Sequence, residues 1–127
     1  MNVGTEWLVD VYDGDAAALA DLARMRSACE RVIEGLDLCV VGSPQWHQFP
    51  PPGGVTGLYL LTESHLACHT YPEYGLATFN LYCCRARPAW DWRGELTAVL
   101  GGGRVSVRTL SRGGRRTVAA ETLGALS

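Results

Sequence analysis

The sequence of 127 residues contains no lysine, because all 11 of its basic residues are arginine. This absence excludes a lysine-bound pyridoxal phosphate and the phosphate-binding lysine of a P-loop. The sequence also has no C-x-x-C pair and an odd number of cysteines, so it predicts neither a zinc ribbon nor a disulfide framework. We expect reduced thiols, as in a cytoplasmic protein. The cysteines are Cys29, Cys39, Cys68, Cys83 and Cys84.

Long apolar runs are missing as well. No stretch approaches the roughly 18 apolar residues that span a bilayer, and residues 1–6 lack a basic segment followed by an apolar one. The formal net charge of −2 leaves no excess of basic side chains for nucleic acid. The composition therefore predicts a soluble, cytoplasmic protein whose partners are neither membranes nor nucleic acids.

The apolar patterns predict one domain, since a chain of this length buries about two-thirds of its unfolded surface. Alternating and short apolar runs predict strands at residues 7–12, 36–41, 55–62, 65–70, 76–84 and 105–110. Apolar residues at three- and four-residue steps predict a helix over 16–34, capped by Asp15 and ended by Gly35, and a second over 88–100. Three consecutive prolines predict a surface loop at residues 50–54.

These elements follow each other in the order β-α-β-β and then β-β-α-β. Helices that cover one face of a mainly antiparallel sheet form a two-layer α/β sandwich. We therefore predict a fold of the α+β class with that architecture.

Reactive side chains gather in residues 63–69 and again at Cys83 and Cys84. A zinc site is disfavoured, because on a strand His65 and His69 share one face while Cys68 points to the other. We expect no metal in this protein.

Nucleophilic catalysis is the next alternative for the same residues. Ser64 is not part of a G-x-S-x-G elbow, and a Cys84–His69 pair lacks the local signatures of cysteine proteases. The residue types alone therefore indicate a site around Ser64, His69 and Cys84 without choosing its chemistry.

Residues 61–84 read LTESHLACHTYPEYGLATFNLYCC. This stretch resembles the core of the prokaryotic S-adenosylmethionine decarboxylase proenzymes, whose pattern is E-S-H, then H-T-[WY]-P-E-Y-G, then a cysteine fifteen residues after the second histidine. His69 and Cys84 keep that spacing. Upstream, residues 47–49 and 54–57 are similar to the H-x-F and G-V-S-G of the family. The resemblance runs from about Trp7 to Leu110.

The resemblance implies that the chain cuts itself between Glu63 and Ser64. Ser64 would become a pyruvoyl group, a ketone that forms the Schiff base otherwise supplied by a lysine-bound cofactor. The products would be a β chain of residues 1–63 and an α chain of residues 64–127. Neither pyridoxal phosphate nor a metal would be required.

The resemblance also implies roles for individual side chains. His69 would remove the α-proton of Ser64 during processing, and the Thr56 hydroxyl, at the position of the family's serine, would support that step. Cys84 would return a proton to the substrate in turnover, because a thiol is mostly protonated at neutral pH. Glu73 would accept hydrogen bonds from the ribose. The aromatic candidates for stacking on adenine or the sulfonium are Phe49 and Tyr71.

The implied reaction is decarboxylation of S-adenosylmethionine to S-adenosylmethioninamine, which feeds spermidine and polyamine biosynthesis. One alternative keeps the machinery but acts on another amino acid, such as ornithine or arginine. The other alternative is a non-cleaving regulatory homologue. The resemblance further implies a homodimer of cleaved chain pairs.

Residues 1–63 carry nine acidic side chains and three arginines, a net charge of −6, whereas residues 64–127 carry four and eight, a net charge of +4. Opposite charges would help the two cut chains to stay paired.

Several positions depart from the family pattern. Asn80 stands where an aspartate is usual, Thr56 replaces a serine, and Glu6 and Trp7 lie where a histidine is frequent. Arg85 and Arg87 follow Cys84 in place of a glycine and an acid. Two arginines would repel a sulfonium but could hold a free carboxylate, so these differences concern the substrate more than the reaction.

Overall fold

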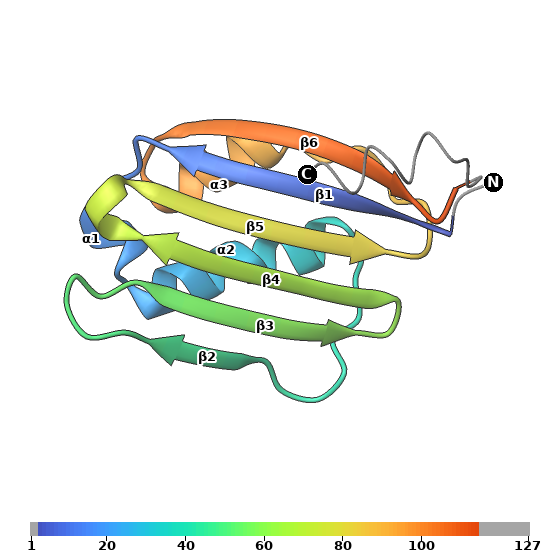
Figure 1. Ribbon diagram of the computed structural model, residues 1–127, viewed down its shortest axis with the longest axis horizontal. Coiled ribbons are helices and arrows are strands. Elements are labelled where there is room, and N and C mark those ends of the chain that lie inside the picture. Colours follow the sequence, from blue (N-terminus) through green and yellow to red (C-terminus); the bar gives the residue numbers. More distant parts are fainter. Residues whose placement is uncertain (1–2, 115–127) are drawn as a thin grey trace, which may run out of the picture.

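In the computed structural model, which describes residues 3–114, a single six-stranded sheet carries all its helices on one face (Figure 1). The strands lie in the order β2-β3-β4-β5-β1-β6, and every neighbouring pair is antiparallel. The predicted α+β class and two-layer sandwich are confirmed. The strands are β1 (Gly4–Tyr12), β2 (Gln45–Gln48), β3 (Val55–Leu61), β4 (Ser64–Tyr71), β5 (Leu76–Cys83) and β6 (Arg104–Arg112). The helices are α1 (Ala16–Leu19), α2 (Leu22–Gly35), the 3-10 turn η1 (Pro72–Tyr74) and α3 (Trp92–Leu100).

The core lies between the sheet and the helices. Alternate residues of each central strand point to the helix side and are fully or almost fully buried. In β5 these are Ala77, Phe79, Leu81 and Cys83, and the residues between them are half-buried. The opposite face of the sheet, which we call the open face, has no helix over it (Figure 1). Core side chains from the sheet include Val9, Val11, Leu66, Phe79 and Leu81, and those from the helices include Met25, Val32, Leu96 and Leu100.

The predicted helix over residues 16–34 is two helices. Asp15 caps α1 by accepting a hydrogen bond from the backbone N–H of Ala18 at 3.0 Å, as predicted, but Asp21 then caps a new helix through the N–H of Arg24 at 3.1 Å. An aspartate side chain competes for backbone N–H groups and favours a helix start over a helix interior. For the same reason α3 begins after Asp91 and not at residue 88.

The predicted strand at residues 36–41 is wrong except at its end, where Val40 forms an isolated antiparallel bridge with Leu61 of β3. Leu36 and Leu38 are buried, but they belong to the turn that ends α2, where the Leu38 N–H donates to the Ile33 carbonyl at 2.8 Å and Asp37 takes a left-handed φ of 54°. Apolar residues that close a helix resemble a buried strand in the sequence. The second strand is instead the polar edge strand β2, which the periodicity does not reveal.

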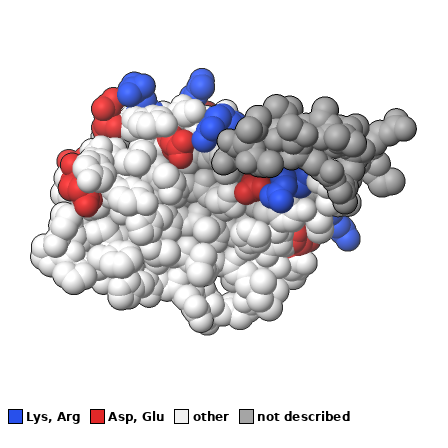
Figure 2. All heavy atoms as spheres, viewed as in Figure 1, with Lys and Arg blue, Asp and Glu red and all other residues white. Residues whose placement is uncertain are grey.

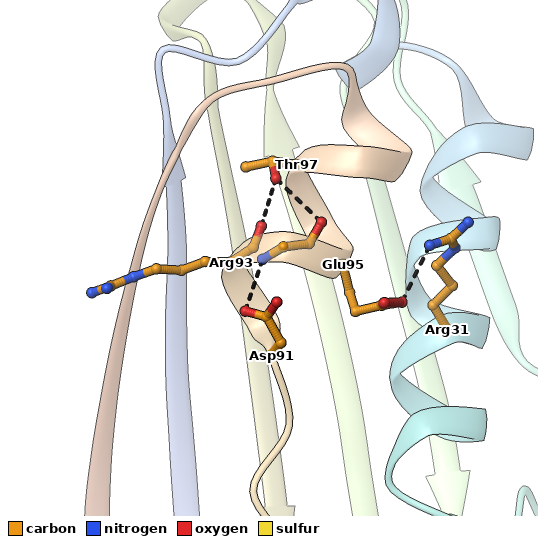
Figure 3. Close-up of polar contacts among 6 residues, drawn as sticks. Arg31, Asp91, Arg93, Glu95 and Thr97 are labelled. Carbon is orange, nitrogen blue, oxygen red and sulfur yellow. Dashed lines mark hydrogen bonds and ion pairs between the residues drawn. The ribbon is translucent and has the colours of Figure 1, made fainter.

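Helix α3 is tied to both layers. Arg31 of α2 and Glu95 of α3 point toward each other in Figure 3 and form an ion pair at 3.2 Å. Arg93 donates from Nε to the Val105 carbonyl of β6 at 3.0 Å.

Within residues 3–114, no helix is long and apolar enough to cross a membrane.

Candidate active site

Ser64 begins β4 immediately after the tight turn that joins it to β3. It is paired with Leu61 of β3 and with Cys83 of β5. Its φ angle is 156°, a value that side-chain-bearing residues rarely adopt and that stores local strain. The strained residue is therefore the serine expected to be processed.

The carbonyl of Glu63 is fixed at the same place. It accepts a hydrogen bond from the backbone N–H of Cys84 at 3.2 Å, so the turn before β4 is held against the end of β5. The thiol of Cys84 is exposed, whereas Cys83 is buried and its burial raises the pKa of that thiol. The structure thus brings Glu63, Ser64 and Cys84 together, and we call this group the cleavage end.

His69 lies near the other end of β4 and faces the open side of the sheet. Its Nδ1 is 2.5 Å from the hydroxyl oxygen of Thr56, its direct partner across β3 and β4. In the tautomer that donates from Nδ1 to Thr56, Nε2 has a free lone pair and can accept a proton, as a general base requires. The structure therefore joins Thr56 and His69.

Aromatic side chains surround His69. The ring of Phe49 lies 5.8 Å and that of Tyr71 4.5 Å from the imidazole, measured between ring centroids. Both line a hollow of about 300 Å³ together with His69 and Glu73. The three predicted substrate-binding residues therefore share one cavity, and with Thr56 and His69 they form what we call the histidine end.

A second hollow, of about 210 Å³, adjoins His69 on the open face. Its lining includes Thr56, Thr78, Asn80 and Arg108.

Within residues 3–114, no three His, Cys, Asp or Glu side chains lie close enough to hold a metal ion.

One chain does not bring the two ends together. Ser64 and His69 lie five residues apart on one continuous strand, and an extended strand rises about 3.3 Å per residue, which separates them by about 16 Å. A histidine at that distance does not reach the α-proton of the serine. Neither Thr56 nor His69 acts on the Ser64 of its own chain in this conformation.

A profile of the S-adenosylmethionine decarboxylase family matches residues 5–113. The chain belongs to this family. Among the relatives of the decarboxylase family, a proenzyme from Thermoplasma volcanium is 35% identical over 114 residues, which cover 89% of this chain and 86% of the relative. One from Thermoplasma acidophilum is 39% identical over 84 residues, which cover 66% of this chain and 63% of the relative, slightly less than two-thirds of its length.

A solved structure of a decarboxylase has the same fold as this chain. The adenosylmethionine decarboxylase from Aquifex aeolicus superposes with a TM-score of 0.73 at 29% identity, covering 91% of this chain and 94% of that one. The resemblance found in residues 61–84 is therefore confirmed at the level of family and fold.

Two of the departures from the decarboxylase family pattern contact each other. Asn80 donates from Nδ2 to a carboxylate oxygen of Glu6 at 2.6 Å, and Arg112 contacts the other oxygen at 2.5 Å. An aspartate at position 80 would place a second carboxylate against Glu6. Glu6 and Asn80 thus form a polar contact between β1 and β5.

Two arginines that follow Cys84 in the sequence have a partner that the sequence did not indicate. The sequence left open whether Arg85 and Arg87 hold a free carboxylate, and in the structure both contact the side chain of Glu63. The available signal was the adjacency of a carboxylate and two cations at the end of paired strands, which becomes visible once β4 and β5 are known to be neighbours.

Proposed function

We propose that this chain is the proenzyme of a pyruvoyl-dependent S-adenosylmethionine decarboxylase, which cuts itself between Glu63 and Ser64 into chains 1–63 and 64–127. The observation that carries the proposal is the strained φ of Ser64 beside a Glu63 carbonyl held by the Cys84 N–H. The family match and the names of the relatives support the substrate.

The cleavage end is arranged for an acyl shift. Ser64 Oγ attacks the carbonyl carbon of Glu63, and the Cys84 N–H, 3.2 Å from the carbonyl oxygen, stabilises the negative charge that develops there. Relief of the strained Ser64 backbone lowers the free-energy cost of breaking the peptide bond. The resulting ester joins Glu63 to the side chain of Ser64.

The next step needs a base at the Ser64 α-carbon, and a second copy of the chain supplies it. A two-fold axis across the strands, with open face against open face, places the histidine end of one copy at the cleavage end of the other. Leu58 and Leu60 of β3 are 52% and 60% exposed, and Figure 2 shows the open face over β2 to β4 as largely uncharged. An apolar, uncharged face of this kind favours association. We therefore propose a homodimer with two shared sites.

The residues present fit a pyruvoyl group, because Ser64 supplies its carbon skeleton and Glu63 and Cys84 frame it. Once formed, the group would supply an electrophilic carbonyl that can condense with the amine of the substrate and withdraw electrons from the bond to its carboxylate. The exposed Cys84 thiol lies at the cleavage end and is the proton donor that we assign to turnover.

Substrate binding is assigned to the hollow at the histidine end. Its volume of about 300 Å³ lies at the lower limit of typical small-molecule sites. Phe49 and Tyr71 present ring faces to a cationic sulfonium or to adenine, and the exposed Glu73 carboxylate accepts hydrogen bonds from ribose hydroxyls. S-adenosylmethionine carries all three groups, whereas ornithine and arginine lack adenine and ribose. This supports the first substrate over the alternatives and links the protein to spermidine synthesis in the cytoplasm.

The mass of the purified chain under denaturing conditions tests the proposal. We expect two chains that break between Glu63 and Ser64, the second lighter by one ammonia than a chain that starts with serine. Ser64→Ala should remain a single inactive chain. An active Ser64→Ala protein would refute the pyruvoyl mechanism, and an uncut wild-type chain would favour the regulatory homologue. Carbon dioxide release from S-adenosylmethionine, ornithine and arginine then identifies the substrate.

A further inference from the structure

The side chain of Glu63 lies between two arginines. One carboxylate oxygen is 2.9 Å from Nε of Arg85, and the other contacts the guanidinium of Arg87. Only 18% of the Glu63 side chain is exposed. Both arginines belong to the segment that follows β5, so the residue that provides the scissile carbonyl is held by charges from the other side of the cut.

The two arginines are not equivalent. The side chain of Arg85 is 78% exposed, whereas that of Arg87 is 11% exposed. Arg87 also donates from Nη1 to the carbonyls of Leu36 and Asp37, each at 3.4 Å, at the end of α2. The partial negative charge of a helix C-terminus favours a cation there. Arg87 is therefore fixed to the helix layer, and its contact with Glu63 holds that side chain in place.

We propose that Arg87 is a positioning residue for self-cleavage. It holds the Glu63 side chain so that the Glu63 carbonyl stays on the Cys84 N–H while Ser64 keeps its strained φ. The inference rests on the proposed self-processing and adds a role that the catalytic side chains do not fill. Arg85, which solvent screens, supports the same contact more weakly.

The step that this contact assists is balanced within the chain. The bond from Ser64 Oγ to the Glu63 carbonyl carbon forms, the peptide C–N bond breaks, and the hydroxyl proton passes to the freed nitrogen. Elimination then removes the Ser64 α-proton and breaks the Cβ–Oγ bond, which releases Glu63 as a carboxylate. Water finally hydrolyses the bond between the Ser64 α-carbon and its nitrogen, so that ammonia leaves and the α-carbon becomes the ketone. After the cut, Glu63 carries its side-chain carboxylate and a new C-terminal carboxylate beside two arginines. The new C-terminus of the β chain is thus held where the uncut peptide was.

The test is the rate at which freshly synthesised full-length chain is cut, followed by intact mass. We expect Arg87→Ala to slow the cut by about tenfold or more, since small displacements of reacting groups have large effects on rate. Arg87→Lys should recover part of the loss, because it keeps the charge but not the planar fork. Arg26→Ala, which removes an exposed ion pair to Glu30 on α2, is the control and should be cut at the wild-type rate.

Glu63→Gln separates positioning from general loss of stability. It should slow the cut as Arg87→Ala does. The double variant should be cut no more slowly than Glu63→Gln, because both changes remove the same contact between Arg87 and Glu63. Turnover per pyruvoyl group, counted by chemical titration, should be unchanged in Arg87→Ala once it is cut. If circular dichroism shows Arg87→Ala to be unfolded, Glu63→Gln and Arg87→Lys decide alone.

Three results would overturn the inference. Arg87→Ala cut at the wild-type rate would remove its role while leaving the proposed function intact. Losses that multiply in the double variant would show that Arg87 acts elsewhere than on Glu63. A wild-type chain that is never cut would refute the proposed function, and this inference with it.

Discussion

Single side chains set the electrostatics of the open face, and Glu6 is the clearest case. Hydrogen bonds from Asn80 and then from Arg112 lower the pKa of the Glu6 carboxyl below its ordinary value of 4.5. A carboxyl with a lowered pKa in the folded state stabilises the fold above its unfolded pKa and loses that contribution as the pH falls through the folded value.

This shift predicts how the stability of Glu6→Gln depends on pH. At pH 7 we expect the variant to unfold at a lower temperature than the wild type, by an amount equivalent to about 1 kcal/mol or less. Below about pH 4.5 the difference should shrink, because the wild-type carboxyl becomes protonated. Thermal unfolding from pH 3 to 7 measures it. Asn80→Asp should also be destabilised at pH 7 and recover as the pH falls; a pH-independent difference for either variant would contradict the account.

The residue scale also explains the strain at Ser64. An outlying φ is kept only where surrounding contacts over-determine it, and here the turn is held on both sides by β3 and β5 and by the contacts of Glu63. The sequence alone indicates the serine through its motif, but the strain is visible only in the folded chain.

At the scale of elements, the junction of β3, β4 and α1 holds the histidine end in place. Thr70 is buried and bridges the N–H of Val55, at 3.0 Å, to the carbonyl of Leu19, at 2.8 Å. Gly54 lies beside this bridge, and a Cβ at that position would come within 2.4 Å of the Thr70 carbonyl oxygen. The glycine is thus required by close approach of two backbones.

Gly54→Ala should therefore destabilise the protein by about 1–3 kcal/mol, as overpacking generally does. Gly57→Ala is the matched comparison, because its Cβ would meet the end of the Trp46 ring, a half-buried side chain on the edge strand, and not a backbone atom. We expect a smaller loss there. Denaturant unfolding of both variants measures the two losses, and a Gly57→Ala variant less stable than Gly54→Ala would contradict this ranking.

At the scale of the whole molecule, the proposed cut leaves the two chains interleaved. Strand β1 from residues 1–63 lies between β5 and β6, which both belong to residues 64–127. Within residues 3–114, five ion pairs join an acid of the first segment to an arginine of the second: Arg85–Glu63, Arg87–Glu63, Arg104–Asp13, Arg108–Asp10 and Arg112–Glu6. The charge asymmetry of the sequence is realised in these contacts.

The proposed dimer predicts complementation between two inactive chains. His69→Ala alone should be cut slowly, by about 10²-fold or more, as for loss of a general base. Mixed with Ser64→Ala, which keeps His69, the His69→Ala chain should be cut again, because each site takes its serine and its histidine from different copies. Intact mass identifies which chain is cut.

The control for complementation is the assembly itself. Leu60→Glu in the Ser64→Ala chain should block rescue and yield monomers in sedimentation, whereas Ala23→Glu, on the exposed side of α2, should do neither. If His69→Ala by itself is cut at the wild-type rate, His69 is not the base for processing. If His69→Ala stays uncut in a mixed dimer with Ser64→Ala, the shared site is wrong.

Local patterns in the sequence determined the class of the fold, the strands β3, β4 and β5, the capping by Asp15 and the motif around Ser64, because alternation, caps and motifs depend on residues close together in the chain. Tertiary structure alone decided that residues 36–38 close a helix, that β2 forms the sheet edge, that Arg87 contacts Glu63 and that about 16 Å separates Ser64 from His69. Those features depend on which distant segments pair. Pairing follows from burial of one sheet face against the helices, and that requires the whole chain.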